Sequence, residues 1–177
     1  MNQRRRVQEL HERFNVRLFL KEFNARYHAD FKVIEEPNPP EAIIQSKSSI
    51  RWVEVTTAYL SEEYAIDLNT YAVEGEKHKP RRQAVYVDSD EQFAEQFVRT
   101  VSKKLEKVTY EPFFREHGKG YLVVSIKDPL FGQSILGAIQ KAWDETEVVD
   151  KGFFKSIYIV YPVFGEYKVS LWKSNLS

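Results

Sequence analysis

Two short and nearly continuous apolar runs, 121–126 and 156–161, constrain the fold of this chain more than any other feature. Runs of this kind are typical of strands that are covered on both faces of a sheet. The apolar spacing between them predicts an amphipathic helix from Phe131 to about Glu145. This alternation favours an α/β fold, in which helices flank both sides of a mixed sheet.

The remaining segments add elements of the same two kinds. Apolar residues at near-helical spacing predict a first helix over about 4–27. Its expected core face is formed by Val7, Leu10, Phe14, Leu18 and Phe23. A strand at 31–35, a hairpin with its turn at 46–49, and a second helix that begins near Glu91 and gives way near Tyr110 follow in order. The alternating segment 166–172 predicts a final outer strand.

Composition and length indicate which general class of protein this chain belongs to. The 177 residues are most simply a single domain, 1–177, and 26 basic residues balance 26 acidic ones. The chain has no cysteine, so disulfides and thiolate metal sites are excluded. The N-terminus lacks the apolar core of a secretory signal, and no segment has the length of a membrane span, so we expect a cytoplasmic protein with no membrane contact. The aromatic share of 14%, with Trp172 on the last strand, is compatible with a homodimer.

The hairpin carries two carboxylates that stand out from its apolar pattern. Glu41 precedes the first strand, and Glu54 lies within the second, on the same face as Trp52 and Thr56. A carboxylate in a β-branched strand is costly to bury without a partner, and two of them on paired strands could hold a divalent cation. The alternative is a surface hairpin in which Glu41 caps the turn and Glu54 faces solvent.

The element order, together with Pro40-Glu41 and Glu54-Val55-Thr56, resembles the PD-(D/E)XK nuclease superfamily. The resemblance implies a restriction-endonuclease-like core, α-β-β-β-α-β, over about 5–126, with a further helix and strands as decoration over 127–177. Glu41 and Glu54 match the two motif acids. The motif lysine would fall on position 56, where this chain has threonine. This departure puts catalytic activity in question.

The same resemblance implies a set of site residues. Glu41, Glu54 and the main-chain carbonyl of Val55 would bind Mg²⁺ or Mn²⁺. The missing basic group would come from the following helix, through Lys104 or Lys103. A glutamate of the first helix often joins such a site, and the candidates here are Glu9, Glu12 and Glu22.

Nucleic-acid contacts are expected from a basic loop within a flap over about 61–89. Lys79, Arg81 and Arg82 would touch phosphates, with Gln96 of the next helix beside them. Such a charge run is also typical of a solvated loop.

Three functions remain open from the sequence. The first is a metal-dependent nuclease that acts on DNA or RNA. The second is a catalytically inactive nuclease-fold module that binds nucleic acid or protein, as in phage defence or a toxin–antitoxin pair. The third is an unrelated α/β domain with a solvated Glu54. Burial of Glu54 beside Glu41 would favour the first function.

Overall fold

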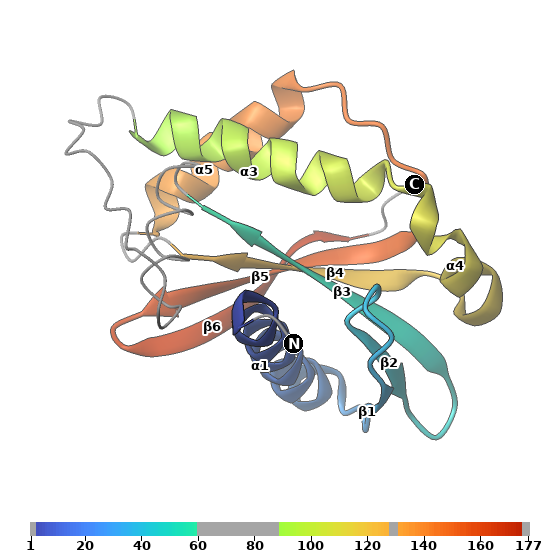
Figure 1. Ribbon diagram of the computed structural model, residues 1–177. Coiled ribbons are helices and arrows are strands. Elements are labelled where there is room, and N and C mark those ends of the chain that lie inside the picture. The colour runs from blue at the N-terminus through green and yellow to red at the C-terminus, as the bar shows by residue number, and fades with distance from the viewer. Residues whose placement is uncertain (1–2, 60–88, 128–130, 175–177) are drawn as a thin grey trace.

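The computed structural model describes residues 3–59, 89–127 and 131–174, which form a six-stranded mixed sheet with helices on both faces (Figure 1). The strands lie in the sheet in the order of the sequence. They are β1 (Lys32–Glu35), β2 (Ala42–Gln45), β3 (Ile50–Ala58), β4 (Gly120–Ile126), β5 (Phe154–Val163) and β6 (Glu166–Ser174).

Four α-helices accompany the sheet in the described part of the chain. They are α1 (Gln3–Tyr27), α3 (Ser89–Leu105), α4 (Glu111–His117) and α5 (Gln133–Glu145), and a 3₁₀ turn, η1 (Val108–Tyr110), joins α3 to α4. Helix α1 crosses one face of the sheet, α3 and α5 cover the other, and α4 lies at the end of the sheet (Figure 1). The predicted α/β class, with a mixed sheet between helices, is confirmed.

The strand directions follow from the connections. The hairpins make β1, β2 and β3 an antiparallel meander, and β6 folds back antiparallel on β5. Strands β3, β4 and β5 run parallel, because the chain passes through a helix between each pair. Both of these helices, α3 and α5, pack on the same face of the sheet.

Each face of the sheet has its own apolar core. On the α1 side, Phe19 and Phe23 pack against Tyr121 and Tyr158 of the central strands. On the other side, residues of α3 and α5 pack with Trp52 of β3 and with alternate residues of β4 and β5. The two-residue period of β3 therefore sends Trp52 and Ala58 to one core, and Val53 and Val55 to the other.

Two local predictions were wrong. The core face of α1 is formed by Val16, Phe19, Leu20 and Phe23, whereas Leu10 and Phe14 are exposed. Phe14 lies on a different side of the helix and meets the ring of Tyr167 on β6 edge-on. The second helix was expected to give way near Tyr110 with no helix after it, whereas a new helix, α4, follows at once, and Pro112 occupies its first turn, where a missing N–H costs nothing.

Trp172 packs against aromatic residues of its own chain. Its ring meets those of Phe97 and Trp143 edge-on, at centroid distances of 5.0 Å each. It is half-buried and packs against the core beneath α3 and α5, and the homodimer stays a prediction.

Among residues 3–59, 89–127 and 131–174, no helix is long and apolar enough to cross a bilayer. The basic residues Lys79, Arg81 and Arg82 and most of the expected flap lie outside the described residues.

Candidate functional site

The candidate site lies where β3 continues beyond its neighbour β2. Strand β2 begins at Ala42, which pairs with Val53, whereas β3 runs on to Ala58. Glu41 stands just before β2, and its carboxylate accepts the N–H of Val55 at 2.7 Å, in the place of a strand partner. Because the N–H and C=O of one strand residue point to the same edge, the carbonyl of Val55 also points toward the Glu41 side.

Glu54 points to the α3 side of the sheet, and only 1% of its surface is exposed. Its Oε1 accepts a hydrogen bond from the hydroxyl of Tyr110 at 2.7 Å and forms an ion pair with Nζ of Lys104. Lys104 lies in the last turn of α3. Its long side chain reaches down to the sheet, where its ammonium group pairs with Glu54. The alternative that placed Glu54 in solvent is therefore wrong.

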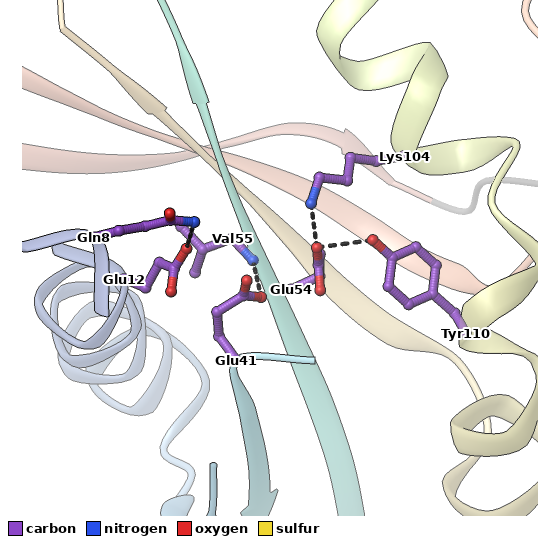
Figure 2. Close-up of polar contacts among 7 residues, drawn as sticks. All are labelled: Gln8, Glu12, Glu41, Glu54, Val55, Lys104 and Tyr110. Atoms are coloured by element: carbon purple, nitrogen blue, oxygen red, sulfur yellow. Dashed lines mark hydrogen bonds and ion pairs between the residues drawn. The ribbon is translucent and has the colours of Figure 1, made fainter. Parts of the chain in front are cut away.

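The two motif acids are close to each other (Figure 2). Burial, followed by the nearby charge of Glu54, raises the pKa of Glu41 to about 9. Glu41 therefore holds its proton at neutral pH in the absence of a cation. Oε2 of Glu54 is buried, and no hydrogen-bond partner for it lies among the described residues. A buried carboxylate oxygen without a donor is costly unless a cation or a proton approaches it.

Glu12 is the first-helix glutamate that belongs to this site. It is buried, its Oε1 accepts a hydrogen bond from Gln8 at 2.7 Å, and it lies on the same side of β3 as Glu41, whereas Glu54 lies on the other side (Figure 2). Burial raises the pKa of Glu12, and the charges of Glu54 and Lys104 both act on it. The other candidates are elsewhere, because Glu9 pairs with Arg5 and Glu22 with Arg26 on the surface of α1.

A signal for Glu12 was present in the sequence. Position 12 precedes Val16 by four residues and Phe19 by seven, so it continues the core stripe of α1. A carboxylate on that stripe has to be buried. The expected core face runs through Leu10 and Phe14. With that face, Glu12 cannot be told apart from Glu9 and Glu22.

Tyr110 is the residue of the site that sequence reasoning missed. It lies in η1, 1% exposed, and its hydroxyl reaches across to Glu54. Burial, and then the charge of Glu54, raises its pKa, so the hydroxyl keeps its proton and remains a donor. Nothing in the local sequence marks this tyrosine, because its partner lies 56 residues earlier in the chain.

The remaining predicted residues lie around this centre. Lys103 is exposed on α3, next to Lys104 but on the outer side of the helix, and Gln96 and Thr56 are half-buried. Within the described ranges, no group of three or more histidine, aspartate or glutamate side chains lies close enough to enclose a metal ion. An ion here would be held by Glu41, Glu54 and the carbonyl of Val55, and water would complete its coordination, as is common for Mg²⁺.

Comparison with known proteins gave no match, whether to a protein-family model, to a curated protein or to a solved structure.

Proposed function

We propose that this protein is a divalent-metal-dependent nuclease of the PD-(D/E)XK type, which hydrolyses phosphodiester bonds in DNA or RNA. The observation that carries the proposal is Glu54, a buried carboxylate beside Glu41 at the open edge of β3, with Lys104 of the next helix against it. The order α1, β1–β3, α3, β4 supports a restriction-endonuclease-like core.

The donor set of the site fits Mg²⁺ or Mn²⁺. Oε2 of Glu54 is buried without an N–H or hydroxyl donor in the described part of the chain, and the raised pKa of Glu41, about 9, reflects a site in which a second negative charge is unfavourable without a cation. Both carboxylates and the Val55 carbonyl are the hard oxygen ligands that these ions prefer. When bound, the ion would lower the pKa of a coordinated water and neutralise charge on the phosphate.

Lys104 would take the part of the lysine that is missing at position 56. Its ammonium group reaches Glu54 from α3, so it brings a positive charge to the site from a different element. There it would stabilise the charge that develops on the phosphate during attack. Glu12, which lies on the opposite side of β3 from Lys104 (Figure 2), would be the further carboxylate available to accept a proton or contact a metal, and burial raises its pKa.

A basic stripe on α1 supports a nucleic-acid substrate. Its members share the outer side of the helix, since they are seven or four residues apart, and all are exposed. They are Arg6, Arg13, Arg17 and Lys21. Arg13 also pairs with Glu36 at 2.6 Å. The stripe lies on α1, the helix that also carries Glu12. A phosphate backbone bound along the stripe would therefore pass close to the candidate site.

A second candidate function is a catalytically inactive module with the same fold. One observation favours it: Oε1 of Glu54 is already occupied by Lys104 and Tyr110, as in a network whose role is to hold α3 and η1 on the sheet. Such a protein would bind nucleic acid or protein without cleaving it.

Cleavage of single- and double-stranded DNA and RNA in Mg²⁺ or Mn²⁺ tests the proposal. Glu54→Gln and Lys104→Met should each lower the cleavage rate about 100-fold or more, as is usual when a preorganised charge is removed from a reacting centre. Glu22→Gln, on the outer surface of α1, is the matched control and should retain full activity.

Calorimetry with Mn²⁺ separates the two functions. Metal binding together with cleavage supports the nuclease. Nucleic-acid binding without metal binding or cleavage supports the inactive module and overturns the nuclease proposal.

A further inference from the structure

The Tyr110 hydroxyl and Lys104 both act on the same oxygen of Glu54. Oε1 receives the hydroxyl hydrogen bond at 2.7 Å as well as the ammonium group, whereas no N–H or hydroxyl group of the described residues donates to Oε2, and the other neighbour of the carboxylate is the carboxyl group of Glu41. Tyr110 and Lys104 therefore fix Oε1 of the carboxylate, and Oε2 is the oxygen that a cation could contact. A free glutamate side chain, by contrast, would exchange its two oxygens by rotation about its terminal bond.

The ring of Tyr110 is itself tightly fixed. Trp52 stacks on it at a centroid distance of 5.4 Å and an interplanar angle of 23°, and Phe154 meets it edge-on at 5.3 Å. The ring is 1% exposed, so its hydroxyl has little freedom to move away from Glu54.

Trp52 is in turn anchored by the backbone at the start of β4. Its Nε1–H donates to the carbonyl of Gly118 at 2.9 Å. Its ring lies flat on Gly120, where an added Cβ would come within 2.3 Å of the indole. A chain of close contacts thus runs from the β4 backbone through Trp52 and Tyr110 to Glu54.

We propose that Tyr110 is a positioning residue, which fixes the Glu54 carboxylate so that Oε2 faces the place where a divalent cation binds. The inference rests on the proposed function, since it assigns a task toward the same metal. Tyrosine suits this task because its hydroxyl donates a hydrogen bond without adding positive charge. A second lysine in its place would repel the cation.

The alternative is that the hydrogen bond only satisfies a buried hydroxyl and contributes nothing to ligand binding. The two roles differ in their effect on metal affinity. Residues that orient a metal ligand typically change affinity about 10- to 100-fold when they are replaced. A purely structural hydrogen bond would change the stability of the fold and leave the affinity as it was.

Calorimetric titration of Mn²⁺ into the wild-type protein, Tyr110→Phe and Tyr161→Phe separates these roles. Tyr161 is the matched control, because its hydroxyl also bonds within the same core, to Ser170 at 3.2 Å, but far along the sheet from Glu54. We expect Tyr110→Phe to weaken Mn²⁺ binding about 10-fold or more. The Tyr161→Phe protein should bind Mn²⁺ as the wild type does.

Circular dichroism and thermal melting establish that each variant is folded. Trp52→Phe serves as a second variant, because it keeps the Tyr110 hydroxyl but removes the indole N–H that bonds to Gly118. It should weaken Mn²⁺ binding by less than Tyr110→Phe does.

The outcomes distinguish this inference from the proposed function. If the wild type binds Mn²⁺ and Tyr110→Phe binds it equally well, Tyr110 has no positioning role, although the metal site stands. If Tyr161→Phe weakens binding as much as Tyr110→Phe, the effect is a general loosening of the core, and the inference is wrong. A wild type that fails to bind Mn²⁺, with and without nucleic acid, overturns the proposed function itself.

Discussion

At the scale of a single residue, the surroundings of Glu41 change the pKa of its carboxyl group. Its side chain is half-buried, it lies beside a second carboxylate, and it accepts a hydrogen bond from the N–H of Val55. These surroundings favour the protonated form and raise its pKa to about 9. The folded state therefore binds a proton over a pH range in which the unfolded chain has released it. This difference makes the stability of the metal-free protein depend on pH.

Replacing Glu41 with glutamine should stabilise the metal-free protein. The ordinary pKa of this group is 4.5, so between pH 4.5 and about 9 the native state holds more protons than the unfolded state, and stability falls as the pH rises. Glutamine keeps an acceptor for Val55 and has no proton to lose. We expect Glu41→Gln to be more stable than the wild type by about 2 kcal/mol at pH 8, and by much less at pH 5.

Urea unfolding in EDTA at pH 5, 6.5 and 8 measures this difference. Glu22→Gln, an exposed carboxylate on α1, is the control and should show no such trend. A difference between the wild type and Glu41→Gln that stays constant with pH would contradict the assigned pKa shift.

At the scale of elements, periodicity predicted nearly all of the described helices and strands, because each buries one face or one stripe against the sheet. It also placed Glu41 and Glu54 on neighbouring strands, since hairpin pairing is local. Periodicity gave the wrong result for a helix that packs against two parts of the structure, and it missed a helix that has a proline in its first turn. Helix α1 packs on the central strands and also touches the edge strand β6, so Phe14 was wrongly assigned to the core, and α4 has a proline in its first turn.

The long-range part of the site could not be predicted from the sequence. Glu12 lies beside Glu41, and Tyr110 bonds to Glu54, only because α1 and η1 pack on the sheet from opposite sides (Figure 2). Lys104 was one of two neighbouring candidates, and only the rotation of α3 places it, and not Lys103, against the strand. The direction of a side chain around a helix is decided by packing, which local spacing does not specify.

The start of β4 should tolerate no side chain at Gly120. An added Cβ would meet the Trp52 ring at 2.3 to 2.7 Å, and the ring is enclosed by Tyr110 and Phe154 and has no room to retreat. We expect Gly120→Ala to lower the free energy of unfolding by about 1–3 kcal/mol, as overpacking of a core usually does. Thermal melting or urea unfolding would measure the loss.

Gly137 provides the opposite case within the same molecule. It lies in α5, and a Cβ there would have no neighbour within 4 Å. Gly137→Ala should therefore raise stability by up to about 1 kcal/mol, because alanine favours the helix. Equal effects of the two substitutions would show that the Trp52 contact does not restrict position 120.

At the scale of the whole molecule, the site is assembled from both faces of one sheet. Helix α1 brings Glu12 to one side of β3 and α3 brings Lys104 to the other, at the stretch of β3 that β2 does not pair with (Figure 2). The chain has no net charge, yet the outer side of α1 carries a row of exposed basic residues. On the proposed function, we expect a bound nucleic acid to lie along α1.

Reversing two charges of this row tests that path. Arg17→Glu with Lys21→Glu should weaken binding of a DNA duplex and make it less sensitive to salt, because fewer counterions are released. For two lost phosphate contacts, the slope of log K against log salt should become shallower by about 1.8. Fluorescence anisotropy over a range of salt concentrations, in EDTA to prevent cleavage, measures both effects. Lys141→Glu with Lys151→Glu changes the net charge equally on the other side of the sheet, and its slope should stay at the wild-type value. If both double variants lose the same affinity and slope, binding follows overall charge, and α1 is not the contact surface.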